Sequence, residues 1–298
     1  MESASLAFAA RQTYRYLRVG IVVLTAVLGA SVVGVVASEG WVWRGSISAY
    51  FYSPARSVFV GALMAIGICL VALQGRLHLE EELLNLAGLL MPFVALVPAP
   101  YAATTCGAAR TCVPEDLVAG VVNNVWAFAV GAMGAIVVAA VVAARDGRLR
   151  GAVRWALLVQ AGVVVTMVAG LQLDRVRFLA IAHYATATPL FLAMVAVVWV
   201  NGRATNRRLR LGDRSVGYGR MYGPIALGML LVIAVAGVLA AWEFFIGGRV
   251  LSGRWLFWVE TLVLGGFAAF WVVQTAEFWQ ETVPEDLTCP SLIPRRPR

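Results

Sequence analysis

Lysine is absent from this sequence, and charge of either sign is scarce. All 24 basic residues are arginine, Asp and Glu together number 16, and charged residues make up 13% of the 298 positions. Soluble domains average about 25% charged residues, whereas here hydrophobic residues reach 61% and the mean hydropathy is +0.81. This balance excludes an ordinary soluble domain and predicts an integral membrane protein. An arginine-only chain rich in Ala, Val and Gly is also typical of a high-GC bacterial genome.

Histidine is also rare, which limits metal chemistry. The only two histidines are His78 and His183, and the topology derived below places them on opposite sides of the membrane. A structural zinc site needs about four Cys or His ligands, and a catalytic one needs about three protein ligands. We therefore expect no metal, no bis-histidine haem and no other cofactor.

Long apolar runs dominate what remains. A membrane span needs about 20 mostly apolar residues to cross about 30 Å of hydrocarbon. The sequence has eight such runs, at 19–38, 57–73, 83–97, 119–144, 154–173, 179–200, 223–245 and 255–274. The third run is the shortest, because Asn85 and Pro98 bracket it. The prediction is an all-α polytopic bundle of about eight spans, with one membrane domain over 1–280 and a cytoplasmic tail over 281–298.

The arginines are distributed unevenly over the connections between these runs. With the amino terminus inside, 17 of the 24 arginines fall on the cytoplasmic side, and the other seven are Arg44, Arg56, Arg110, Arg175, Arg177, Arg249 and Arg254. Because cytoplasmic loops are enriched in Lys and Arg, both termini are predicted to be cytoplasmic, in a plasma-membrane protein. Orientation and anionic lipid headgroups explain the basic residues more simply than nucleic acid does. The first run lacks a cleavage site after it and is expected to remain as a span.

Two of the four cysteines share one predicted outer loop. Cys106 and Cys112 lie between the third and fourth runs, where oxidising conditions permit a disulfide. We expect them to be bonded, with free thiols or a metal site as the alternatives. Cys69 is expected to be a small buried hydrophobe, and Cys289 a reduced thiol in the tail.

Polar residues whose burial in a bilayer costs free energy cluster at the expected outer ends of the runs. Ionisable and amide side chains within a bilayer tend to face the bundle interior or a cavity. If the bundle closes normally, these groups converge on a polar cavity in the outer leaflet. The predicted ligand-binding set is Ser46, Ser48, Tyr50, Arg56, Asn123, Asn124, His183, Glu243 and Glu260.

Each of these residues also has a structural interpretation. His183 alone is more often a packing residue than a ligand or a base. Glu260 can pair with Arg254 at the interface, and Ser46 and Ser48 can cap the turn that leads into the second run. The clustering, rather than any one side chain, favours a functional pocket.

The loop after the first run resembles a known family signature. Residues 46–56 read Ser-Ile-Ser-Ala-Tyr-Phe-Tyr-Ser-Pro-Ala-Arg, and Val-Phe-Val-Gly follows at 58–61. This is similar to the first-loop signature of the DRAM/Frag/Sfk superfamily of multi-pass membrane proteins. The segment His183-Tyr-Ala-Thr-Ala-Thr-Pro-Leu-Phe191 is similar to the family's histidine-led span, and Glu260 to the glutamate that opens its last span. The chain also resembles a family of uncharacterised bacterial, actinobacterial integral membrane proteins.

That resemblance implies work on or near lipids. Members of the superfamily are linked to remodelling of lipid anchors, phospholipid asymmetry and membrane trafficking. The resemblance therefore favours binding or modulation of lipids through the outer-leaflet pocket, with membrane lipids as partners. A homo-oligomer or a partner membrane protein is an open alternative. The family core usually has six spans, whereas eight are predicted here.

Two other functions stay open. An intramembrane lipid hydrolase needs a nucleophile, a base and an orienting acid. Ser48, His183 and either Asp174 or Glu260 supply these residue types, but no nucleophile-elbow motif accompanies them. The second alternative is a small-molecule transporter. The inverted repeats and paired broken helices that mark many transporters are not evident in the sequence.

Overall fold

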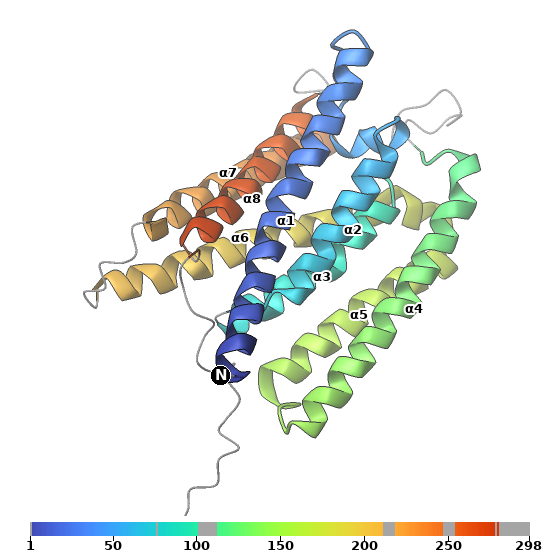
Figure 1. Cartoon of the computed structure of the whole chain (residues 1–298). Coiled ribbons are helices and arrows are strands. Elements are labelled where there is room, and N and C mark those ends of the chain that lie inside the picture. The colour runs from blue at the N-terminus through green and yellow to red at the C-terminus, as the bar shows by residue number, and fades with distance from the viewer. Residues whose placement is uncertain are drawn as a thin grey trace, which may run out of the picture.

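The computed structural model describes residues 2–75, 77–100, 112–210, 218–246, 254–277 and 279. Those ranges contain eight α-helices, two short 3-10 helices and no strand (Figure 1). The α-helices are α1 (Glu2–Ser38), α2 (Arg56–Ala72), α3 (His78–Leu96), α4 (Glu115–Arg145), α5 (Gly151–Leu173), α6 (Arg175–Arg210), α7 (Tyr222–Ile246) and α8 (Trp255–Glu277). The 3-10 helices are η1 (Ser48–Tyr52) and η3 (Tyr218–Met221). The all-α class is therefore confirmed, and each expected run corresponds to one helix.

Within the described ranges, six of the eight helices are long and apolar enough to cross a membrane. The α2 helix has 17 residues, which is short of the roughly 20 needed. The first turns of α3 carry Glu80, Glu81 and Glu82, so this helix lacks an apolar stretch long enough to span the membrane on its own. The structure shows a multi-pass arrangement of apolar helices. The full count of eight spans and the cytoplasmic placement of both termini stay predictions.

Two helices extend well beyond the apolar runs that predicted them. The α1 helix begins at Glu2 rather than near residue 19, and α6 continues to Arg210 rather than ending near residue 200. Residues 2–18 contain neither Gly nor Pro and include four Ala, three Arg and two Leu, which favour helix whatever the solvent. Apolar length therefore located the helices correctly but underestimated their ends.

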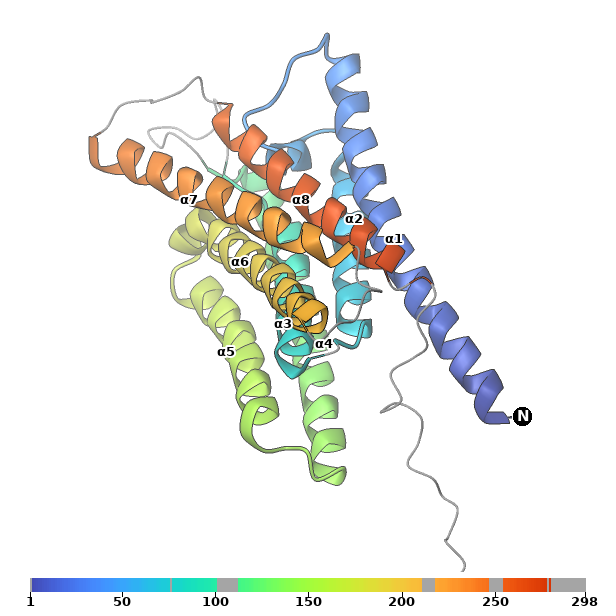
Figure 2. The ribbon, with the colours of Figure 1, turned by 90° about the vertical axis from the view of Figure 1, so that its left-hand side faces the viewer.

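The α3 helix lies at the centre of the bundle, and α2 and α6 pack most extensively against it. From Leu89 to Ala95 every α3 residue is buried. Figures 1 and 2 place the α4–α5 hairpin on one side of α3, away from α7 and α8. Because neighbouring helices cover α3, its sequence does not need the continuous apolar surface of a lipid-facing span.

Two glycines set the close crossing of α2 and α3. A Cβ added at Gly67 would lie 2.9 Å from the carbonyl oxygen of Gly88, and a Cβ at Gly88 would lie 2.7 Å from that of Gly67. Small residues at such a crossing let two helix backbones approach closely. This contact also fixes α3 relative to the loop that precedes α2.

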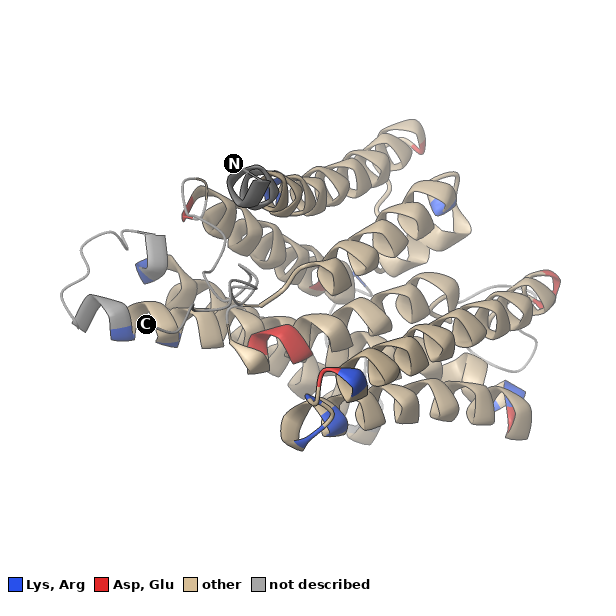
Figure 3. Ribbon diagram, turned by 60° about the horizontal axis from the view of Figure 1, so that its bottom comes forward, with Lys and Arg blue, Asp and Glu red and all other residues tan. Residues whose placement is uncertain are grey.

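Two apolar cores hold the bundle together. The larger core joins α1, α2, α3, α6, α7 and α8, and the smaller one joins α4 and α5 to α3 and the first turns of α6. Charged residues lie mostly near helix ends, with long uncharged stretches between them (Figure 3). This separation matches helices whose middle sections lie in hydrocarbon.

Candidate functional site

The connection between α1 and α2 folds back over the ends of α6 and α8. Gly40 and Trp41 adopt positive φ values of 72° and 63° just after α1, so the chain reverses there. Glycine tolerates this conformation without steric cost. Further along, the carbonyl oxygen of Gly45 accepts a hydrogen bond from the backbone N–H of Phe257 at 2.9 Å. The loop is thereby attached to the first turn of α8.

Ser48 is the centre of a polar group contributed by four segments. Its backbone N–H and its Oγ each lie 3.0 Å from an oxygen of the Glu260 carboxyl group on α8. The Nε2 of His183 on α6 lies 3.0 Å from the same Oγ, and the Nδ1 of His183 lies 2.7 Å from the carbonyl oxygen of Val97. Ser48 and His183 are buried, at 8% and 2% exposure. One network thus connects η1, α6, α8 and the end of α3.

The number of hydrogens that the contacts of this network require constrains the protonation of His183 and Glu260. The carbonyl oxygen of Val97 only accepts, so Nδ1 of His183 carries a hydrogen. The Ser48 hydroxyl has one hydrogen but two neighbours, Nε2 and the Glu260 carboxyl group. Both contacts are satisfied when one further hydrogen resides on His183 or on Glu260. The network then has no net charge, as an imidazolium with a carboxylate or as two neutral groups.

Three more contacts stabilise the loop itself. Ser46 Oγ accepts a hydrogen bond from the backbone N–H of Ala49 at 3.0 Å, which ties the loop to the first turn of η1. Arg44 donates to Glu39 Oε1 at 2.7 Å and to the carbonyl oxygen of Tyr52 at 3.3 Å. The charge of Arg44 is therefore offset within the loop.

A cavity of about 980 Å³ opens next to this network, between α6, α7 and α8. Its volume is at the upper end of the range of about 300–1,000 Å³ typical of small-molecule sites. One end is polar and is lined by Arg44, Ser46, His183, Tyr184, Glu243, Trp255 and Glu260. The remainder is mostly apolar and is lined by Ala187, Phe191, Ile233, Ala236, Gly237, Ala240, Val259 and Val263, among others. The cavity therefore has a polar head and an apolar body.

The apolar body runs along the helix axes. On α7 the cavity wall extends from Glu243 to Ile233, which is about 15 Å at a rise of 1.5 Å per residue. Tyr184 and Thr188 on α6, and Gly237 and Ala240 on α7, line the cavity and are also exposed. The cavity is thus open along the side of the bundle where α6 and α7 meet the surroundings.

The structure brings part of the predicted set together. Ser46, His183, Glu243 and Glu260 line the cavity, and Ser48 lies directly behind its wall, bonded to His183 and Glu260. The expected pairing of Glu260 with Arg254 is replaced by the two bonds to Ser48. The convergence of the first loop with α6, α7 and α8 is therefore present.

Other members of the set have structural roles instead. Tyr50 is fully buried, and its hydroxyl oxygen accepts from the backbone N–H of Arg44 at 3.3 Å. Arg56 donates from Nε to the carbonyl oxygen of Phe51 at 2.8 Å and stacks over that ring. Asp174 accepts from the backbone N–H of Arg177 at 2.9 Å and caps α6. None of these three side chains lines the cavity.

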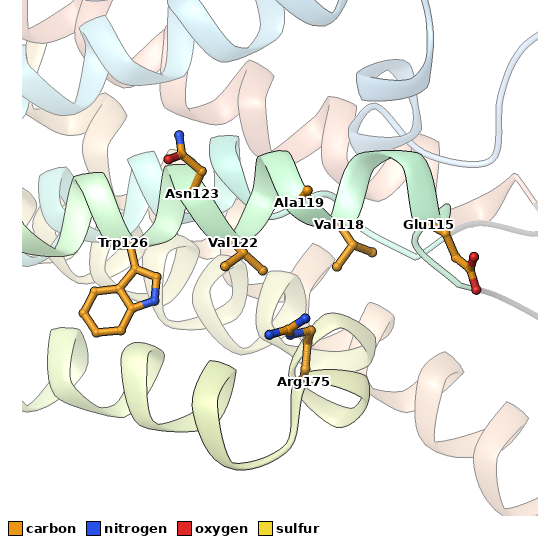
Figure 4. Close-up of a pocket in the computed structure, with 7 residues that line it drawn as sticks. All are labelled: Glu115, Val118, Ala119, Val122, Asn123, Trp126 and Arg175. Carbon is orange, nitrogen blue, oxygen red and sulfur yellow. The ribbon is translucent and has the colours of Figure 1, made fainter.

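The two asparagines lie on α4, away from the cavity. Both are exposed, and Asn123 lines a separate crevice of about 630 Å³ with Glu115, Trp126 and Arg175, as Figure 4 shows. Asn124 lines neither space. The structure therefore does not bring them to the cavity on which the predicted set was expected to converge, because sharing one leaflet does not fix the position around the bundle.

The cysteines are partly described. Cys69 is a free residue of α2, as expected, but it is half-buried rather than buried. Cys112 forms a disulfide, and Cys106, its expected partner, lies outside the described residues, as does Cys289. The pairing of Cys106 with Cys112 therefore stays a prediction.

A second buried polar group was missed by the sequence analysis. Asn201 on α6 donates to Glu80 on α3 at 2.9 Å, and Gln274 on α8 is 3.5 Å from both. All three side chains are buried. This group lies near the other ends of α6 and α8, since 18 residues separate His183 from Asn201 on one continuous helix. Their spacing is about 27 Å along the axis.

Three residues outside the predicted ligand-binding set also lie at the polar end of the cavity. Arg44, Tyr184 and Trp255 line it. In the sequence Arg44 directly precedes the 45–56 loop and Tyr184 follows His183, whereas nothing singled out Trp255. A fold of packed helices does not by itself indicate an activity. Comparisons of the chain with protein-family models, with curated proteins and with solved structures find no match.

Proposed function

We propose that this protein binds a membrane lipid in the cavity between α6, α7 and α8, with the headgroup at the polar end. The observation that carries the proposal is the division of one cavity of about 980 Å³ into a polar head and an apolar body. A lipid is divided in the same way, into a polar headgroup and apolar acyl chains. The expected topology places the polar end in the extracytoplasmic leaflet.

The side opening supports entry from the bilayer. Lipid acyl chains already lie beside the exposed faces of α6 and α7 if these helices span the membrane. An acyl chain that enters between Thr188 and Gly237 contacts apolar wall residues along about 15 Å of α7. The network around Ser48 holds the loop over the polar end, so the headgroup site is preorganised before binding.

Filling the cavity with an introduced side chain tests whether a lipid binds there. Gly237 lines the cavity, and a Cβ added there meets no atom within 4 Å, so Gly237→Leu places its side chain in open space. We expect this variant to fold but to lose the lipid that the wild-type protein retains in native mass spectrometry. Gly228→Leu is the matched control, because Gly228 is on the same helix, has equally open space and does not line the cavity. Equal lipid retention by all three proteins would refute the proposal.

A lipid hydrolase is the second candidate, favoured by one contact. His183 Nε2 lies 3.0 Å from Ser48 Oγ, and the carbonyl oxygen of Val97 orients the ring through Nδ1, as a nucleophile and base require. Two observations count against it. Glu260 bonds Ser48 rather than His183, and Ser48 is not among the residues that line the cavity. Release of fatty acid that persists in Ser48→Ala would exclude Ser48 as a nucleophile.

A further inference from the structure

Among the described residues at the polar end of the cavity, the charges do not balance, and the imbalance lies at one residue. Four ionisable side chains line that end among the described residues apart from Tyr184: Arg44, His183, Glu243 and Glu260. Arg44 is paired with Glu39 at 2.7 Å. His183 and Glu260 share Ser48 in the network that is neutral when its hydrogen bonds are satisfied.

Glu243 is the one of these four side chains whose charge no described residue offsets. The indole N–H of Trp255 donates to its Oε1 at 3.2 Å, and no described Arg or His side chain forms an ion pair with it. It is half-buried near the end of α7. A carboxylate in this position presents one negative charge to whatever fills the polar end.

Aromatic rings line the same end. Trp255 and Tyr184 are both part of the cavity wall. The face of a Trp or Tyr ring attracts an ammonium group, and the attraction grows when the group is withdrawn from water. A carboxylate beside aromatic rings is thus suited to a cationic amine and unsuited to an anion.

We propose that the cavity selects lipids whose headgroup carries an ammonium group, with Glu243 as the residue that distinguishes them from anionic lipids. This rests on the proposed lipid site and adds the class of headgroup. A zwitterionic phospholipid places its ammonium group at Glu243, whereas a phosphatidylglycerol headgroup offers that carboxylate only hydroxyl groups and adds a net negative charge.

A competition experiment tests this selectivity. The purified protein is equilibrated in detergent with equal amounts of phosphatidylethanolamine and phosphatidylglycerol of identical acyl chains, and bound lipid is counted by native mass spectrometry. Loss of a hydrogen bond to a charged group corresponds to about a tenfold change in affinity. We therefore expect about a tenfold preference for phosphatidylethanolamine in the wild-type protein and none in Glu243→Gln.

Two further variants separate charge from folding. Glu243→Asp keeps the carboxylate and is expected to keep the preference, and Glu115→Gln removes an acidic side chain from the separate crevice and is expected to change nothing. Lipid bound by the wild-type protein with no preference, or a preference that survives in Glu243→Gln, overturns the headgroup assignment while leaving the lipid site intact. Lipid retention that Gly237→Leu does not reduce overturns both.

Discussion

Glu260 accepts two hydrogen bonds from Ser48, one from the backbone N–H and one from Oγ, both at 3.0 Å, although 212 positions separate the two residues. The contact fastens the loop after α1 to α8. Because His183 bonds the same Oγ at 3.0 Å, the loop cannot move away from the cavity without breaking all three interactions. The network is therefore the structural support of the candidate site.

The first prediction concerns coupling within this network. Glu260→Ala and Ser48→Ala each remove one partner of the same side-chain contact, so their effects on the free energy of unfolding should not add. We expect a coupling energy of about 0.5–3 kcal/mol, with the lower part of that range typical of hydrogen bonds in membrane proteins. Unfolding in detergent of the wild type, both single variants and the double variant measures it. Additivity within about 0.5 kcal/mol would mean that the contact contributes little.

The second prediction concerns the crossing of α2 and α3. Gly67→Ala places a Cβ 2.9 Å from the carbonyl oxygen of Gly88, and such overpacking costs about 1–3 kcal/mol. Gly61→Ala, on the same helix, meets no atom within 4 Å and should be neutral or stabilising by up to about 1 kcal/mol, because alanine favours helix. Melting temperatures should therefore shift in opposite directions. A loss of the same size in both variants would argue against a close crossing.

The third prediction separates the two buried polar groups. Asn201→Leu removes the amide that donates to Glu80 at 2.9 Å and should destabilise the protein by about 1–3 kcal/mol. The change is about 27 Å from His183 along α6, so lipid retention at permissive temperature should stay unchanged. Thermal unfolding and native mass spectrometry on the same preparation check both parts. Selective loss of lipid without loss of stability would show that the two ends of α6 are coupled.

The fourth prediction concerns orientation, which rests on the distribution of arginines. In a background with Cys69 and Cys289 replaced by alanine, a single cysteine is introduced at Arg254 or at Arg148, both exposed. A thiol reagent that does not cross membranes should label Arg254→Cys in intact cells and Arg148→Cys only after permeabilisation. The reverse pattern would place both termini outside and the polar end of the cavity in the cytoplasmic leaflet.

The sequence predicted the helices because apolar length is a direct physical requirement for crossing a bilayer. The ends of α1 and α6 were missed, since a helix can continue into water wherever no residue stops it. The convergence of Ser48, His183 and Glu260 could be predicted from the sequence for a similar reason, because the alternation of spans places all three at one end of the bundle. Their hydrogen-bond partners could not be predicted, because the partner that each side chain reaches depends on the rotation of its helix.

Position around the bundle explains the remaining differences. Asn123 and Glu243 are predicted at the same end of the bundle, yet α4 lies on the far side of α3 from α7 (Figure 1). Glu80, Asn201 and Gln274 are separated widely in sequence, and no one of them stands out without its partners. The apolar body of the cavity gave no signal, since Ala and Gly at its wall resemble ordinary helix-packing residues.

The most direct test of a lipid in the cavity is photocrosslinking with a phospholipid that carries a diazirine in the middle of its acyl chain. The account predicts adducts on the apolar wall, at residues such as Phe191, Ile233 and Val263, that disappear in Gly237→Leu and persist in Gly228→Leu. Adducts spread evenly over exposed helix faces, such as Val137 and Val138 on α4, and unchanged by Gly237→Leu would contradict it.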